Sequence, residues 1–141
     1  MNAVTAELTV RFPGNLAYLH SAARLSRMMC EVIDDPGLQS GFTDAVELAV
    51  SEAFTNAVRY SQESGQGVVL AFSILSDRLV ILVKDPGPGY DMDKIPTPDF
   101  DAHPEGGYGL FIIHSLMDTV SYTRESPLNT FRMEKSFRKI S

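Results

Sequence analysis

A chain of 141 residues has room for one domain with a core of ordinary size, and none for a second domain. Hydrophobic residues make up 44% of the chain and charged residues 21%, as in average soluble proteins, and no apolar run approaches the roughly 20 residues of a membrane span, so we expect no membrane association. The formal net charge of -6, with no cluster of Lys or Arg, argues against a nucleic-acid partner and favours a protein partner with basic surfaces.

The first part of the chain predicts a strand followed by a helix. Residues 1–15 lack a basic segment followed by an apolar one, so they do not resemble a secretory signal, and we expect a cytoplasmic protein. Residues 5–12 alternate polar and apolar side chains, which predicts a half-buried strand. Apolar residues at helical spacing predict a helix over residues 15–33, with Asn15 able to cap its start. Cys30 is the only cysteine, which excludes an internal disulfide and is typical of a small buried apolar residue.

The middle of the chain predicts a second helix and two adjacent strands. Apolar side chains at spacings of three and four predict a helix over residues 43–60, whose apolar stripe should face the sheet: Val46, Val50, Ala53, Phe54 and Ala57. The β-rich runs at residues 67–75 and 78–84 predict a hairpin of two buried strands.

A long segment rich in Pro, Gly and Asp then separates this hairpin from a third predicted helix at residues 110–118. A loop of this length inside a compact domain is usually functional or mobile. Two further strands, at residues 119–125 and 129–137, close the chain. The predicted fold is therefore α+β, a two-layer sandwich with a mixed, largely antiparallel sheet and helices on one face.

Glu52 and Asn56 stand out within the second helix, in the segment SEAFTNAVRYS. The two residues lie one turn apart and therefore project from the same face. Their side-chain oxygens suit a hard cation such as Mg²⁺ or an activated water. Taken alone, the pair is more typical of an ordinary solvated helix face than of a ligand site.

Two glycine-rich segments follow. In DPGPG, Asp85 supplies a hydrogen-bond acceptor at a strand end, and Gly87 and Gly89 allow a flat ligand to approach the backbone. In EGGYGLFII, glycines that include Gly107 and Gly109 open a helix whose free N–H groups suit a phosphate. Each segment alone is also what an ordinary turn or helix cap requires.

Taken together, SEAFTNAVRYS, VKDPGPGYD and EGGYGLFIIHSLMDTVSY resemble the N, G1 and G2 boxes of the gyrase, heat-shock chaperone and histidine kinase (GHKL) ATPase superfamily. The resemblance spans nearly the whole chain and is strongest to the anti-sigma factor serine kinases. It implies the Bergerat ATP-binding fold, one domain over residues 1–141 and an ATP lid at about residues 90–105. The length leaves no room for the helical hairpin of a histidine kinase or the coupling domain of gyrase-like members, so we expect neither class.

The resemblance implies roles in phosphate chemistry for four positions. Asn56 matches the residue that holds Mg²⁺ between the ATP phosphates. Glu52 matches the general base, which takes the proton of a substrate serine in the kinases. Gly107 and Gly109 match the glycines that let the lid fold over the phosphates.

It also implies how adenine would be bound. Asp85 matches the carboxylate that accepts a hydrogen bond from the adenine amino group, and Gly87 and Gly89 match the floor beneath the base. Thr130 matches a threonine on the last strand that reaches adenine through water.

Three positions depart from the family pattern. Tyr108 stands in the glycine turn where many relatives have a basic residue, so the resemblance implies no γ-phosphate contact from there. Arg59 and Tyr60 stand where a histidine is common. None of these changes removes a phosphate-binding glycine or the matching base.

The function implied by the resemblance is that of a cytoplasmic anti-sigma factor with serine-protein kinase activity. It would bind a sigma factor and, with ATP and Mg²⁺, phosphorylate a serine on a small anti-anti-sigma protein of the STAS type. A homodimer is a further implication, with the amphipathic segment 15–32 as the candidate apolar face. The main alternative is a nucleotide-sensing module that regulates a partner by sequestration alone, and the remaining one is a purely structural α+β domain.

Overall fold

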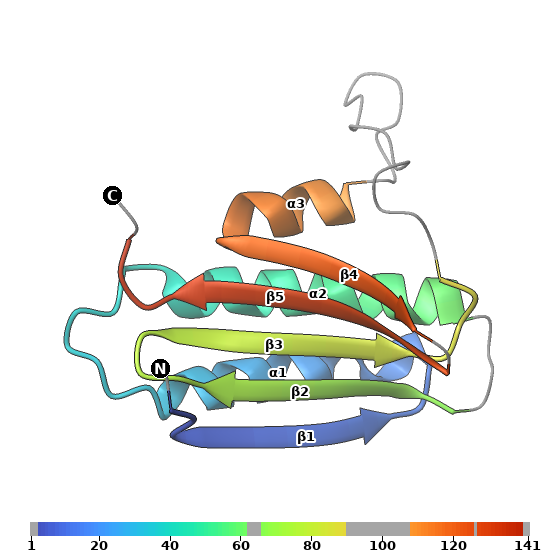
Figure 1. The fold of residues 1–141 in the computed structure, drawn as a ribbon, viewed down its shortest axis with the longest axis horizontal. Coiled ribbons are helices and arrows are strands. Elements are labelled where there is room, and N and C mark those ends of the chain that lie inside the picture. The colour runs from blue at the N-terminus through green and yellow to red at the C-terminus, as the bar shows by residue number, and fades with distance from the viewer. Residues whose placement is uncertain (1–2, 62–65, 90–107, 126, 140–141) are drawn as a thin grey trace.

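The computed structural model describes residues 3–61, 66–89, 108–125 and 127–139. Figure 1 shows helices α1 (Leu19–Glu31) and α2 (Phe42–Ser61) lying behind a sheet, with the short helix α3 (Gly109–Leu116) packed against α2. Within the described ranges, no helix has both the length and the apolar character that crossing a bilayer needs.

The sheet has five strands in the spatial order β1-β2-β3-β5-β4: β1 (Ala6–Phe12), β2 (Val68–Ile74), β3 (Arg78–Asp85), β4 (Thr119–Glu125) and β5 (Leu128–Ser136). All four pairings between these strands are antiparallel. The predicted α+β fold, with helices on one face of a largely antiparallel sheet, is confirmed.

The core lies between the sheet and the helices. The predicted apolar stripe of α2 is buried throughout, and Phe54 packs edge-on against Phe12 of β1 with ring centroids 5.9 Å apart. Cys30 lies in the same core, and burial raises the pKa of its thiol to about 11, so it stays protonated and unreactive at neutral pH.

The helix predicted over residues 15–33 is divided in two. A short 3-10 helix (Leu16–Tyr18) precedes α1, and the Asn15 side chain accepts a hydrogen bond from the Ala17 N–H at 2.8 Å. The predicted cap is therefore present, but it starts a tighter turn than an α-helix. The other predicted helices and strands begin and end within two residues of the observed bounds.

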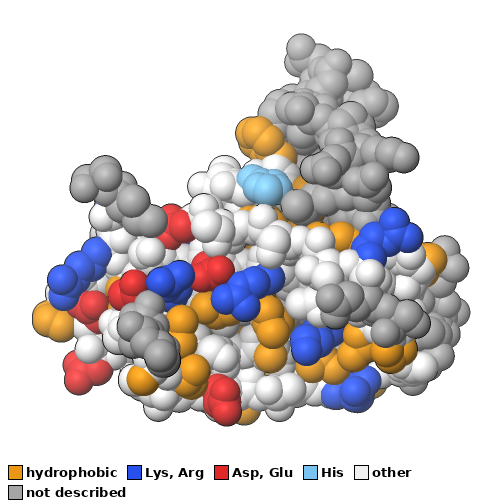
Figure 2. All heavy atoms as spheres, viewed as in Figure 1, with side chains coloured by type: hydrophobic (Ala, Val, Ile, Leu, Met, Phe, Trp, Pro, Cys, Tyr) orange, Lys and Arg blue, Asp and Glu red, His pale blue; other side chains and the backbone are white. Residues whose placement is uncertain are grey.

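The sheet face that no helix covers carries charged side chains among apolar ones. Figure 2, drawn from that side, shows Lys and Arg lying among apolar side chains. Val69 and Val80 alternate along their strands with core-facing neighbours, yet they are only 9% and 6% exposed. Both valines are therefore nearly covered, although they lie on the face without helices.

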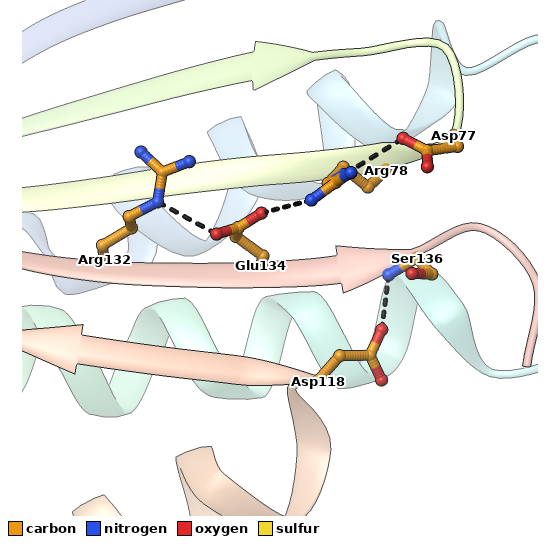
Figure 3. Close-up of polar contacts among 6 residues, drawn as sticks. All are labelled: Asp77, Arg78, Asp118, Arg132, Glu134 and Ser136. Carbon is orange, nitrogen blue, oxygen red and sulfur yellow. Dashed lines mark hydrogen bonds and ion pairs between the residues drawn. The ribbon is translucent and has the colours of Figure 1, made fainter. Parts of the chain in front are cut away.

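On that face one ion pair joins β3 to β5, and a second lies within β5. Arg78 donates to one oxygen of Glu134 and Arg132 donates to the other, each at 3.0 Å (Figure 3). Burial raises the pKa of Glu134, but the hydrogen bonds from Arg132 and Arg78 outweigh it and hold that pKa below its usual range. These contacts favour the β3–β5 register, which places Asp85 opposite Asn129.

Candidate functional site

Three segments that are distant in the sequence meet at one end of the sandwich. They are the C-terminal half of α2, the end of β3 and the start of α3. A pocket of about 10 Å³ lies between α2 and the strands, lined by Ala53, Asn56, Ala57, Val83, Asp85, Tyr122 and Phe131. That volume is about the space of one water molecule.

Asp85 is the last residue of β3 and is only 4% exposed. Its Oδ1 accepts the backbone N–H of Gly87 at 2.9 Å and the side-chain amide of Asn129 at 3.4 Å. Among the described residues, both donors reach Oδ1, and none reaches Oδ2. The carboxylate is thus oriented by one oxygen and can accept a ligand donor with the other.

Asn129 is a site residue that the sequence analysis missed. It is 6% exposed, and its amide donates to the Gly87 carbonyl at 2.7 Å as well as to Asp85. The β5 register pairs Asn129 with Asp85 and Thr130 with Lys84. Because successive strand residues point to opposite faces, Asn129 lies on the helix side of the sheet and Thr130 on the other side.

The structure therefore does not bring the predicted Thr130 to the pocket. Its neighbour Phe131 lines the pocket, while Thr130 does not. The sequence alone does not tell which of the adjacent polar residues Asn129 and Thr130 shares a face with Asp85. Only the pairing register between β3 and β5 decides this, and it selects Asn129.

Gly89 ends the DPGPG turn in a left-handed conformation, with φ of +78°. A Cβ added there would lie 2.8 Å from Arg124 Nε, 3.1 Å from Asn129 Oδ1 and 3.2 Å from the Tyr122 hydroxyl. Both the backbone angle and the close neighbours require glycine at this position. Gly87 contributes through its backbone. Its N–H donates to the Asp85 carboxylate, and its carbonyl accepts from the Asn129 amide.

Glu52 and Asn56 lie side by side on α2 and meet the start of α3. A Cβ added at Gly109 would lie 3.1 Å from Glu52 Oε2 and 3.3 Å and 3.4 Å from the two side-chain amide atoms of Asn56. Both α2 residues are half-buried. Glycine at the first position of α3 thus leaves the space beside the carboxylate and the carboxamide open.

Some of the predicted site lies outside the described residues. This is the case for Gly107 and for the lid expected at residues 90–105. Tyr108 immediately precedes α3 and its side chain forms no capping hydrogen bond. Its carbonyl accepts the Ile112 N–H at 2.9 Å, which begins the hydrogen-bond pattern of the helix.

The residues at this site fit a Mg²⁺ ion that has Asn56 as its protein ligand. In the part of the chain that the structure describes, no three His, Cys, Asp or Glu side chains gather as a metal cluster. Mg²⁺ commonly takes only one or two protein ligands and completes its shell with phosphate oxygens and water. The Asn56 oxygen beside the open space at Gly109 matches that requirement.

Comparison with known proteins identifies relatives over nearly the whole chain. Residues 12–135 match the model of the histidine kinase-like ATPase domain family. The chain is 34% identical over 143 residues to the serine-protein kinase RsbW of Staphylococcus aureus (strain MRSA252), covering 94% of this chain and 87% of that protein.

Two solved structures share the fold. The structure of the RsbU and RsbW domains of a Mycobacterium tuberculosis protein matches 97% of this chain with a TM-score of 0.63 and 14% identity, and the chain spans 35% of that structure's length. The structure of the SiaB–SiaC complex from Pseudomonas aeruginosa matches 92% of this chain and 89% of the other, with a TM-score of 0.56 and 13% identity.

Proposed function

The chain belongs to the family of histidine kinase-like ATPase domains, and we propose that within this family it is an ATP-dependent serine-protein kinase and anti-sigma factor. The observation that carries the proposal is the meeting of Glu52, Asn56 and Gly109 beside the Asp85 pocket. The chain is 34% identical to a serine-protein kinase over 87% of that protein, which supports phosphoryl transfer to a serine as its reaction. Residues 1–141 then act as one domain whose lid is the segment 90–105.

Adenine binds against Asp85. The free Oδ2 of this buried carboxylate accepts the exocyclic amino group, and Asn129 holds Oδ1 in place. Gly87 and Gly89 keep the turn beneath the base free of side chains. A purine that carries a carbonyl instead of an amino group would place an acceptor against the carboxylate, so the pocket selects adenine.

Phosphoryl transfer takes place where α2 meets α3. Asn56 holds the Mg²⁺, which supplies positive charge against the phosphate oxygens. The backbone N–H groups at the start of α3 face the same phosphates. Glu52 accepts the proton of the substrate hydroxyl, and its carboxylate lies beside Gly109 at the start of α3, where the phosphates would bind.

The partners of this reaction are proteins. We assign the chain two of them: a sigma factor that it sequesters, and a small STAS-type anti-anti-sigma protein whose serine it phosphorylates. The net charge of -6 fits partners with basic surfaces. Both partners and this chain would meet in the cytoplasm.

A direct assay tests the proposal. The purified protein is incubated with labelled ATP, Mg²⁺ and the small STAS-type protein encoded nearest its gene, and the products are analysed by mass. Phosphate on a serine of the small protein is the expected result. ATP binding without any transfer would contradict the kinase activity and leave the second candidate, a nucleotide-sensing module that acts by sequestration. Tyr108, in place of a basic residue, is the observation that favours this candidate.

A homodimer is part of the proposal, because α1 exposes apolar side chains beside an open sheet edge. A groove of about 760 Å³ lies between β1 and α1. Its lining is half apolar (Val10, Phe12, Leu25 and Met28) and half polar or charged (Ser21, Arg24, Arg27 and Glu31). In the described sheet β1 pairs only with β2, so its other edge is free to meet a second copy. Met28 in this groove is 50% exposed, and Val32, the residue that follows α1, is 59% exposed.

Replacing Met28 with Glu is expected to shift the protein from dimer to monomer, because it replaces an exposed apolar side chain of the groove with a charged one. Light scattering coupled to size-exclusion chromatography measures the mass. Leu48→Glu is the matched control, since Leu48 is 45% exposed on α2 and does not line the groove. A wild-type protein that is monomeric at micromolar concentration would contradict the homodimer.

Asn129 is expected to matter for ATP binding more than Thr130 does. Asn129→Ala removes the amide that orients Asp85 and should weaken ATP binding about tenfold, the usual cost of an orphaned buried polar partner. Thr130→Ala should leave the affinity nearly unchanged, since Thr130 lies on the other face of the sheet. Isothermal titration measures both, and a larger loss in the Thr130 variant would return that residue to the adenine site.

A further inference from the structure

Charged side chains are sorted by sign along the open sheet face, the face of the sheet that no helix covers. The antiparallel registers align the side chains of this face in rows that cross the strands. In the row nearest the pocket, Arg11 of β1 and Lys84 of β3 flank Val69 of β2. Two rows further from the pocket, the aligned side chains include Glu7 and Glu134 instead. Toward the right end, where β1 and β3 finish, Figure 2 shows Lys and Arg among apolar side chains and no described Asp or Glu.

The cations at the pocket end of this face have no acidic partner among the described residues. Arg11 donates to a neutral group, the backbone carbonyl of Gln66. Lys84 is half-buried and forms no hydrogen bond or ion pair within the described ranges. At the other end of the face, by contrast, two arginines pair with Glu134. The pocket end therefore carries positive charge without counter-ions, although the chain as a whole has a net charge of -6.

Lys84 has apolar neighbours on two sides. Val69 lies opposite it on β2 and is only 9% exposed, and Leu82, two residues earlier on β3, shares its face and is half-buried. The carbon stem of a lysine packs on such a surface while its ammonium reaches toward water. A partner that covers the apolar side chains would remove water from this ammonium, so the partner has to supply a negative group. The surface therefore suits a ligand that is both apolar and acidic.

The spacing of the two cations indicates the shape of that ligand. Neighbouring strands lie about 4.8 Å apart, so the backbones of Arg11 and Lys84, two strands apart, are separated by about 10 Å. In an α-helix, side chains seven residues apart share one face and lie about 10.5 Å apart, with two more side chains of that face between them. Side chains on one face of an extended strand recur at about 7 and 14 Å and do not match. The row fits a helix with two acidic side chains seven residues apart and apolar ones between them.

We propose that this end of the open sheet face, formed by Arg11, Val69, Leu82 and Lys84, binds an acidic amphipathic helix of a protein partner. Carboxylates of the helix pair with Arg11 and Lys84, and its apolar side chains cover Val69 and Leu82. A nucleic acid fits this face less well, because two cations are few and the net charge of -6 repels a polyanion. The inference goes beyond the proposed function, since this docking requires neither ATP nor phosphoryl transfer.

Three synthetic helical peptides test the inference. One carries Glu at two positions seven residues apart, with Leu three and four residues after the first, and the other two carry Gln or Lys in place of Glu. Fluorescence anisotropy measures the binding of each labelled peptide to the full chain without ATP. The wild type should bind the Glu peptide about tenfold or more tightly than the Gln peptide, the scale of a charged hydrogen bond. The affinity for the Glu peptide should fall as the salt concentration rises.

Charge reversal locates the binding site. Lys84→Glu and Arg11→Glu should each weaken binding of the Glu peptide about tenfold or more, and Lys84→Glu should strengthen binding of the Lys peptide. Lys139→Glu is the matched control, because it makes the same change in net charge at an exposed position outside the sheet. Thermal unfolding shows whether each variant is folded, and Lys84→Gln, which removes the charge without reversing it, replaces Lys84→Glu if that variant unfolds.

Several results would overturn the proposal. They are failure of the wild type to bind the Glu peptide, and equal losses of affinity in the Lys84, Arg11 and Lys139 variants. Self-association of the wild type that Lys84→Glu abolishes, without peptide binding, would assign the face to a second copy of this chain instead. None of these results depends on ATP binding or on transfer to a serine, so failure of this inference and failure of the proposed function are distinguishable.

Discussion

Replacing Glu52 with Gln is expected to slow phosphoryl transfer by about 100-fold or more, the usual scale for loss of a general base. Gln keeps the size of the side chain and its contact with Gly109, but it does not accept the substrate proton. ATP affinity should stay nearly unchanged, because the adenine contacts come from Asp85 and Asn129 on other elements. The variant therefore separates chemistry from binding.

Single-turnover transfer to the STAS-type substrate measures the chemical step, and isothermal titration measures ATP binding. Glu47→Gln is the matched control. Glu47 lies on the same helix, but its carboxylate pairs with Arg27 at 3.4 Å rather than facing α3. Transfer at the wild-type rate in the Glu52 variant would remove Glu52 from the role of base.

The fold followed from local patterns because most of its elements are amphipathic. The stripe from Val46 to Ala57 predicted α2 and its buried face, and the alternation in β1 predicted a half-buried strand with one face on the core. Asn15 predicted the start of the first helical segment through its cap. Each of these signals depends on residues that are close in the sequence.

The site could be predicted only in part, because its contacts depend on pairings between distant segments. Glu52 and Asn56 were placed on one face by helical spacing alone. Their contact with Gly109 depends on how α3 packs against α2, which no local pattern encodes. Asn129 was missed because its position opposite Asp85 depends on the β3–β5 register.

Asn129 also explains how this pocket can work with a strand residue other than the expected threonine. A carboxamide donates two N–H bonds and so reaches both Asp85 and the Gly87 carbonyl, at 3.4 Å and 2.7 Å. A hydroxyl has one proton and would satisfy only one of these acceptors at a time. The DPGPG turn and the carboxylate are therefore held by a single side chain of β5.

Replacing Asn56 with Ala is expected to abolish Mg²⁺-dependent nucleotide binding. Asn56 is the proposed protein ligand of the metal, and the described residues offer no cluster of His, Cys, Asp or Glu that would replace it. Without the metal, the phosphates repel one another and the nearby Glu52 carboxylate. Adenine contacts with Asp85 remain, so weak binding that is independent of Mg²⁺ should persist.

ATP affinity measured with Mg²⁺ and with a chelator tests this expectation, since the wild type should bind more tightly with the metal and the variant should show no difference. Thr55→Ala is the matched control: Thr55 is the neighbouring residue, and its hydroxyl donates to the Ser51 carbonyl at 2.8 Å within α2. Magnesium-dependent affinity that survives in the Asn56 variant would remove Asn56 from the metal site.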